Sequence, residues 1–121
     1  GVASPLAGTT WQLESMGDPA APTPALAQPP VTLNFDSTKA EIGGNSGCNS
    51  YGGGYKVDGA KVTFSQIVGT LMACAEQPAM DQETQYLQAL QKVSQFAING
   101  DQLDLTDESG KVLRFRATAK S

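Results

Sequence analysis

The two cysteines are the residues of this 121-residue chain that could most readily form a covalent link. Cys48 and Cys74 lie 26 positions apart, and no Cys-x-x-Cys motif is present that would favour a redox site. In a small domain from an oxidising compartment, two cysteines fit one disulfide. Two buried free thiols are the alternative, because free cysteine is among the most buried residue types. We favour the disulfide, which would join two distant segments of the chain.

Few residues of this chain could support catalysis or bind a metal. The chain has no histidine, so the commonest general base is missing. Two cysteines alone give too few soft ligands for zinc. A Ser–Lys or two-carboxylate mechanism would need its residues at a suitable spacing, and no such spacing is evident. We therefore expect a protein that is not an enzyme and that holds no metal and no cofactor.

One carboxylate stands out because of the helix that would carry it. Residues 78–94 are rich in Gln, Glu, Ala and Leu and contain no glycine, which predicts a helix. Glu83 projects into the middle of its apolar face, and a carboxylate there is costly unless it is hydrogen-bonded. We predict that Glu83 is mostly buried and has a structural rather than a catalytic role. The apolar face at helical spacing comprises Met80, Tyr86, Leu87, Leu90 and Val93.

The donors to Glu83 are expected from a glycine-rich run. Residues 43–55 hold six of the thirteen glycines, which predicts a bent backbone that another segment approaches closely. This run and the segment Gly69-Thr70 would expose backbone N–H groups, and side-chain donors would come from Ser46, Asn49 and Thr70. Glu83 would then attach the helix to the two cysteine-containing loops.

Alternating apolar and polar residues predict strands through most of the chain. Asp58-Gly59 and Asn99-Gly100 are strong hairpin-turn signals. We expect about eight strands and one helix in a mainly β (α+β) fold with a single core. The expected strands are residues 9–15, 31–36, 40–42, 50–57, 61–65, 95–98, 102–106 and 111–118.

Residues 16–30 interrupt this pattern with five of the seven prolines. Proline lacks the N–H that a sheet needs, so we predict a surface loop that serves as a variable connection. Its part from Pro19 to Pro30 is expected to be dispensable for folding. The aromatic residues allow two interpretations: they could line a ligand cavity or fill the core, and we favour filling. These residues are Trp11, Phe35, Phe64, Phe96 and Phe115.

Length and charge exclude several classes of protein. The length fits one domain over residues 1–121, with residues 1–8 as an N-terminal tail. Twelve acidic residues against eight basic ones give a net charge of −4, and no concentrated basic face is visible for binding nucleic acid. No apolar run approaches eighteen residues, so no transmembrane helix is expected.

Several segments together resemble the META domain, also called the HslJ-like family of bacterial envelope proteins. They span almost the whole chain in the family's order, and they are specific as a set. The main departure is the proline-rich loop. The segments are Gly8-Thr9-Thr10-Trp11-Gln12-Leu13, Ser46-Gly47-Cys48-Asn49-Ser50-Tyr51, Thr70-Leu71-Met72-Ala73-Cys74, Met80-x-x-Glu83-x-x-Tyr86-Leu87-x-x-Leu90, Leu103-Asp104-Leu105-Thr106-Asp107 and Leu113-Arg114-Phe115.

The resemblance implies a small curled antiparallel β-barrel or half-barrel with one packed α-helix. It also implies export, to the periplasm or as an outer-membrane-anchored lipoprotein, and a link to stress response or antibiotic tolerance. We expect a monomer that binds an unknown envelope protein, with membrane contact only through a lipid anchor. A calycin-like barrel that binds a small apolar ligand is the alternative. The signature positions carried over are structural: Trp11, Gly47, Cys48, Asn49, Thr70, Met72, Cys74 and Glu83.

Overall fold

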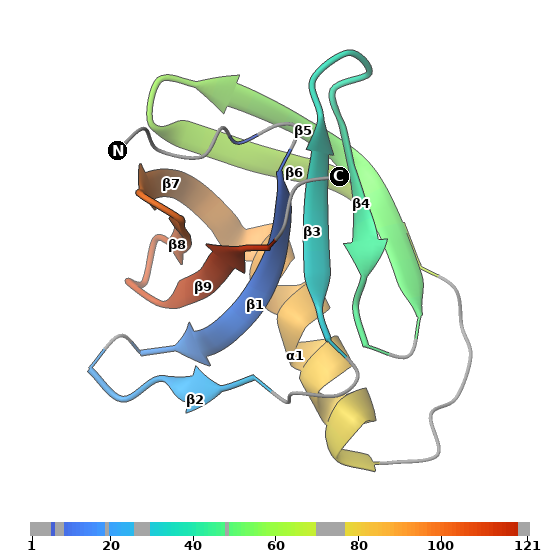
Figure 1. The fold of residues 1–121 in the computed structure, drawn as a ribbon, viewed down its shortest axis with the longest axis vertical. Helices are drawn as coiled ribbons and strands as arrows, with labels where there is room; N and C mark the ends of the chain where they lie inside the picture. The colour runs from blue at the N-terminus through green and yellow to red at the C-terminus, as the bar shows by residue number, and fades with distance from the viewer. Residues whose placement is uncertain are drawn as a thin grey trace.

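The computed structural model describes residues 6, 9–18, 20–25, 30–47, 49–69 and 77–118. Within them the chain forms strands and one helix, in the order shown in Figure 1. The elements are β1 (Thr10–Gly17), β2 (Thr23–Pro24), β3 (Thr32–Asp36), β4 (Glu41–Asn45), β5 (Ser50–Asp58), β6 (Lys61–Gly69), α1 (Gln77–Lys92), β7 (Val93–Asn99), β8 (Gln102–Asp107) and β9 (Val112–Ala117).

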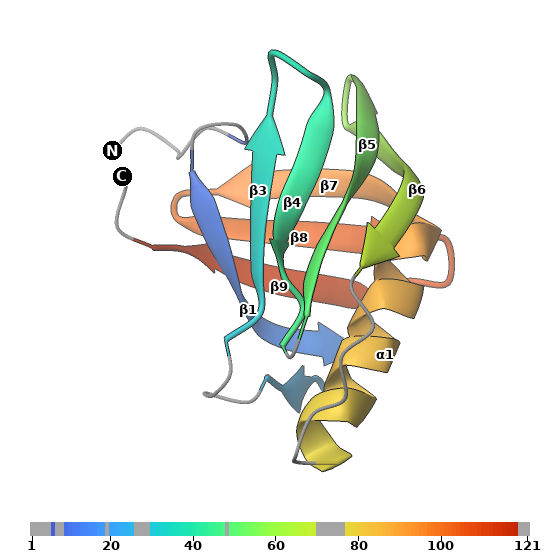
Figure 2. The ribbon, with the colours of Figure 1, turned by 90° about the vertical axis from the view of Figure 1, so that its right-hand side faces the viewer.

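Eight of the strands close into an antiparallel barrel. Their order is β1-β3-β4-β5-β6-β7-β8-β9, and β9 pairs with β1 to complete the ring. The strands β3, β4 and β5 lie in front of β7, β8 and β9, which run across them (Figure 2). The predicted fold class is therefore confirmed, with the closed barrel rather than the half-barrel.

The predicted loop over residues 16–30 begins too early. Strand β1 continues to Gly17, and Met16 belongs to the core at 7% exposure. A β-bulge between Leu13 and Ser15 shifts the alternation, which hides this continuation in the sequence.

The loop also contains the short strand β2, which the sequence analysis missed. Thr23 pairs with Met16, and the Ala25 N–H donates to the Glu14 carbonyl at 2.8 Å. Pro24 is tolerated because β2 is an edge strand, where a missing N–H breaks no inner ladder. The loop is therefore partly paired with the barrel.

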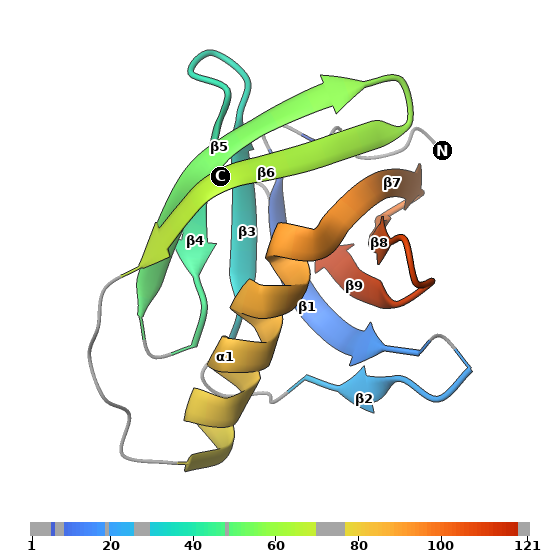
Figure 3. The same cartoon turned by 180° about the vertical axis from the view of Figure 1, so that it is seen from behind.

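The pairing between β6 and β7 is the least extensive of the described pairings in the barrel. The described ladder contains one pair, Lys61 with Gln95, and the Phe96 N–H donates to the Ala60 carbonyl at 2.9 Å. Figure 3 shows α1 alongside β6 and leading directly into β7. The helix thus covers the side of the barrel where these two strands diverge.

Strand β6 also extends to Gly69, beyond the predicted end at residue 65. Gln66 has a φ of 53°, in the left-handed region, and this irregularity interrupts the alternation from which strands are predicted.

The barrel interior is filled by the inward-facing side chains of the alternating strands. Trp11 and Phe115 are 0% exposed and Phe35 is 4% exposed, so these three aromatic residues belong to the core, as the core-filling interpretation predicted. Phe64 and Phe96 are only half-buried and pack at its margin. The remaining buried apolar residues of the core cluster are Leu13, Met16, Val31, Leu33, Ile42, Tyr51, Val62, Tyr86, Leu90, Val93, Leu103, Leu105 and Leu113.

Helix α1 is close to its predicted bounds but is rotated about its axis. Its buried residues are Ala79, Gln82, Tyr86 and Leu90. Met80 and Leu87, which were expected on the buried face, are half-buried. Among the described residues no helix combines the length and the apolar character that crossing a bilayer requires.

Candidate functional site

Glu83 joins the helix to the glycine-rich run, as predicted. Its Oε2 accepts hydrogen bonds from the Ser46 hydroxyl at 2.7 Å and from the Asn49 backbone N–H at 3.0 Å. Its Oε1 accepts a bond from the Asn49 side-chain amide at 2.8 Å. These contacts link α1 to the segment between β4 and β5.

Glu83 is partly buried and lies at the margin of the buried face of α1 rather than in its middle. The rotation of α1 places Gln82 on the buried face and moves Glu83 towards the edge of the barrel. There the carboxylate reaches the segment after β4 without entering the core, so its charge costs less than on a fully buried face.

The Ser46–Glu83 contact has the distance of a nucleophile and its base, but its surroundings indicate a structural role. Ser46 is 0% exposed, so a substrate cannot reach its hydroxyl. That hydroxyl also lies 3.0 Å from the Asn49 carbonyl, and Gly47 is buried with its N–H bonded to the Asn45 side chain at 2.8 Å. The network therefore holds a turn in place.

Four predicted site residues lie outside the described residues: Cys48, Thr70, Met72 and Cys74. The disulfide and the expected contact of Thr70 with Glu83 therefore remain predictions. Trp11 is described, and its indole N–H donates to the Leu6 carbonyl at 3.1 Å.

A pair of tyrosines forms a second link between helix and barrel, which the sequence analysis missed. The hydroxyl oxygens of Tyr51 and Tyr86 are 2.5 Å apart, and the Tyr51 hydroxyl donates to the Thr32 carbonyl at 2.7 Å. Because that carbonyl can only accept, Tyr86 is the donor to Tyr51. Burial raises the pKa of both hydroxyls, so both remain protonated.

The outer face of β4 and β5 carries an unusual surface that we call the glycine strip. It is a row of four residues on adjacent strands: Asn34 pairs with Gly43, Gly43 with Gly52, and Gly52 with Val68. Val68 is 70% exposed, which is the larger of the two high exposures found for big apolar residues. The two central positions have no side chain, and both are partly exposed.

Most glycines near the strip are required by the barrel itself. A Cβ at Gly44 would lie 2.2 Å from the Thr32 carbonyl oxygen, and one at Gly53 would lie 2.8 Å from the Ser65 carbonyl oxygen. Gly43 differs, because a Cβ there would meet its nearest atom, the Tyr51 carbonyl oxygen, at an ordinary 3.7 Å. The fold therefore gives no steric reason for glycine at position 43.

A separate hollow, which we call the helix groove, lies between α1, the end of β1, β2 and the β8–β9 hairpin. Its volume is about 260 Å³. The apolar part of its lining consists of Met16, Ala89, Val93, Leu105, Val112 and Leu113, and the polar part includes Thr23, Gln85, Gln88, Lys92, Asp107 and Lys111. The groove thus combines an apolar floor with a polar rim.

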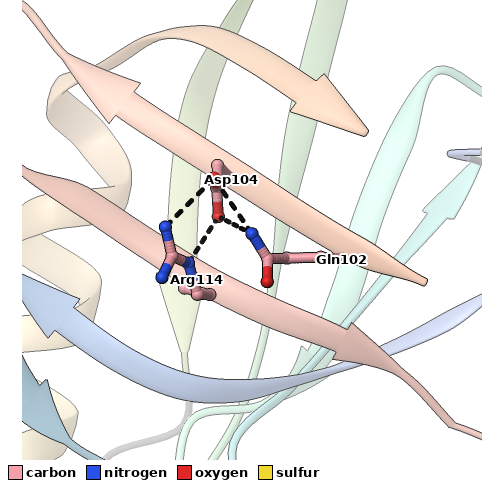
Figure 4. Close-up of polar contacts among 3 residues, drawn as sticks. All are labelled: Gln102, Asp104 and Arg114. Carbon is pink, nitrogen blue, oxygen red and sulfur yellow. Dashed lines mark hydrogen bonds and ion pairs between the residues drawn. The ribbon is translucent and has the colours of Figure 1, made fainter. Parts of the chain in front are cut away.

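The arginines of β9 are paired, whereas the lysines of the groove are not. Arg114 Nε lies 3.0 Å from Asp104 Oδ1, and Gln102 also approaches this carboxylate (Figure 4). Arg116 Nε lies 3.8 Å from Glu14. Neither Lys92 nor Lys111 forms an ion pair with any described residue.

Comparison with known proteins gives the relationship. The family model of the META domain matches residues 4–120, which is nearly the whole chain. The chain belongs to the META-domain family. No curated protein matches it significantly.

Solved structures share the fold of this META domain. A protein from Burkholderia xenovorans solved by NMR is 30% identical with a TM-score of 0.77, covering 95% of this chain and 85% of that one. A DUF4847-family protein from Bacteroides vulgatus, solved by crystallography, is 14% identical with a TM-score of 0.68, covering 96% of both chains. A second NMR structure is 21% identical with a TM-score of 0.66, covering 90% of this chain and 88% of that one. The last two similarities concern the fold alone.

Proposed function

We propose that this META-domain protein is a non-enzymatic module of the bacterial cell envelope that binds another protein through the glycine strip. The observation that carries the proposal is Gly43, a glycine that the barrel does not need sterically. Glycine inside a strand costs about 0.5–1 kcal/mol relative to alanine, so its presence at an open position calls for another reason. A partner surface that packs directly on the bare backbone supplies that reason.

The neighbours of Gly43 suit a protein partner. Val68 offers an exposed apolar side chain at one end of the strip, and Asn34 offers a polar side chain at the other. An apolar contact flanked by polar groups is the usual composition of a protein interface. The strip is small, so the interaction is of the transient kind.

Export and a role in envelope stress remain part of this proposal. We expect the protein in the periplasm or held at the outer membrane by a lipid anchor, acting as a monomer. A lipobox cysteine encoded upstream of this domain would support the anchored form.

A ligand inside the barrel, as in a calycin, is the weaker candidate. Trp11, Phe35 and Phe115 occupy the interior, so a ligand there would have to displace core side chains. Displacing them would cost several kcal/mol each.

Site-specific photo-crosslinking in the native bacterium tests the protein-binding proposal. A benzophenone amino acid at Asn34 should give one defined protein adduct, and the same probe at exposed Lys111 on another face should not give it. Adding Gly43→Thr should remove the Asn34 adduct, because the new side chain covers the bare backbone while threonine favours a strand. An adduct that persists in the Gly43→Thr background would contradict the assignment of the strip.

A further inference from the structure

The helix groove has the chemistry of a small-ligand site, independent of the glycine strip. We infer that it binds a free single-chain anionic amphiphile, with the chain on its apolar floor and a carboxylate between Lys92 and Lys111. The glycine strip belongs to β3–β6, whereas the groove belongs to α1, β1, β2 and the β8–β9 hairpin. Either assignment can therefore fail without the other.

The apolar part of the ligand is set by the floor of the groove. Leu105 and Leu113 are core residues whose surfaces end at the groove, and Ala89 is the small residue of the helix wall. A larger side chain at position 89 would occupy the space, so alanine keeps the groove open. A volume of about 260 Å³ lies just below the range of about 300–1,000 Å³ for drug-sized ligands, which favours a medium-length chain.

The charges on the rim of the groove indicate which head group the ligand carries. Lys92 from α1 and Lys111 from the hairpin both line the groove and the hollow that continues it. Both have no ion-pair partner among the described residues. Two unpaired ammonium groups beside an apolar floor are suited to a carboxylate, to which each can donate charge-assisted hydrogen bonds.

Two carboxylates, those of Asp107 and Glu108, also lie near the two lysines. Asp107 accepts several hydrogen bonds from its own turn. Asp107 Oδ1 accepts bonds from the Ser109 N–H at 2.9 Å, the Ser109 hydroxyl at 2.7 Å and the Lys111 N–H at 3.0 Å. These bonds hold the hairpin turn, but their donors are neutral, so Asp107 keeps its negative charge. Within the groove it is outnumbered by Lys92 and Lys111. Glu108 is exposed on the same turn and lines only the continuing hollow, not the groove.

Titration of the isotopically labelled protein with decanoate, below its micelle concentration, tests this inference by NMR. Amide shifts should concentrate at Ala89, Lys111 and Val112. Lys92→Gln combined with Lys111→Gln should weaken decanoate binding roughly tenfold or more, because each lost charge-assisted bond weakens affinity severalfold. Binding of uncharged decanol should be weaker from the start and should not respond to this double variant.

Two controls make the result decisive. Lys39→Gln with Lys56→Gln changes the net charge equally at exposed sites away from the groove and should leave decanoate affinity unchanged. Ala89→Leu should abolish binding of both probes while the helix is retained, because leucine is a good helix former. If that variant fails to fold, the lysine variants still decide the question.

Three results would overturn the inference. One is an equal loss of affinity in both lysine double variants, which would indicate a general charge effect. Another is a set of amide shifts centred away from the groove. The third is binding to phosphatidylglycerol vesicles without binding to decanoate, which would indicate a membrane surface instead of a free amphiphile.

Discussion

Glu83 shows how one side chain can set the rotation of a helix. Its carboxylate accepts three hydrogen bonds from Ser46 and Asn49, so α1 cannot turn about its axis without breaking them. This explains why Gln82 is buried while Met80 and Leu87 lie at the margin, contrary to the simple apolar pattern.

Substitutions at Glu83 should separate the loss of shape from the loss of acceptors. Glu83→Ala removes all three acceptor contacts and should lower the free energy of unfolding by about 2–3 kcal/mol. Glu83→Gln keeps the shape and one carbonyl oxygen, so it should cost less. Urea unfolding measures both, with exposed Asp81→Ala on the same helix expected to stay within about 0.5 kcal/mol of wild type. A Glu83→Ala variant as stable as the wild type would mean that this carboxylate acts as a solvated surface charge.

The tyrosine pair gives a prediction based on the direction of its hydrogen bonds. Tyr86→Phe removes a donor but leaves Tyr51 bonded to the Thr32 carbonyl. Tyr51→Phe leaves the buried Tyr86 hydroxyl without this acceptor and removes a donor from Thr32. Tyr51→Phe should therefore cost about 1 kcal/mol more than Tyr86→Phe in denaturant unfolding. The reverse ranking would contradict the donor assignment.

The same pair predicts a loss of stability in alkali. Burial is the main cause that raises the pKa of Tyr51 and Tyr86 in the folded protein, whereas an unfolded tyrosine ionises near pH 10. The contribution of these two buried hydroxyls to the free energy of unfolding is thus fully present below about pH 10. It is lost as the pH rises towards their pKa values in the folded protein. The Tyr51→Phe, Tyr86→Phe double variant should lose less stability than the wild type as the pH rises above about 10. Parallel pH profiles would show that other groups control alkaline unfolding.

At the scale of elements, two adjacent glycines of β4 should respond oppositely to alanine. Gly44→Ala places a Cβ 2.2 Å from a backbone carbonyl that cannot move away, so we expect a loss of several kcal/mol. Gly43→Ala meets only an ordinary contact and should leave stability unchanged or raise it by up to about 1 kcal/mol. Thermal unfolding of the two variants compares them directly. A destabilising Gly43→Ala would remove the main argument for the glycine strip.

Local sequence signals predicted the hairpin turns and one side-chain contact correctly, but not the full length of every strand. Asp58-Gly59 and Asn99-Gly100 mark real hairpins, and both glycines have a positive φ, of 62° and 65°. The contact of Glu83 was predictable because a carboxylate in an apolar stripe needs donors. In β1 and β6, bulges hid the full strand lengths because they break the alternation on which strand prediction depends.

The surfaces could not be predicted in the same way. The helix groove brings together Ala89, Met16 and Val112, which are far apart in the sequence, so no local pattern contains it. The glycine strip depends on the strand register, which aligns Gly43 with Gly52 and Val68, and a shift of one residue would abolish it.

For the whole molecule, the two ends of the barrel sheet lie next to each other. The Thr118 N–H donates to the Thr10 carbonyl at 2.9 Å, and Trp11 pairs with Ala117. Joining residues 9 and 118 by a short Gly/Ser linker and opening the chain after Gly59 should therefore preserve the barrel, because Gly59 lies in an exposed hairpin turn. Circular dichroism and denaturant unfolding measure the outcome. Opening the chain after Gly44 instead, inside the ladder, should prevent folding, and equal stability of both permutants would contradict this account.

The pairing of the first long strand with the last also determines when folding can finish. Strand β1 needs β9 for its second neighbour, and about a hundred residues of chain separate the two. During synthesis, β1 therefore emerges long before its partner. Until then its unpaired edge and the apolar side chains around it are exposed to other chains. The barrel can close only after the last strand has emerged, so an earlier arrest would leave a species that is prone to aggregation and that a holding chaperone would recognise.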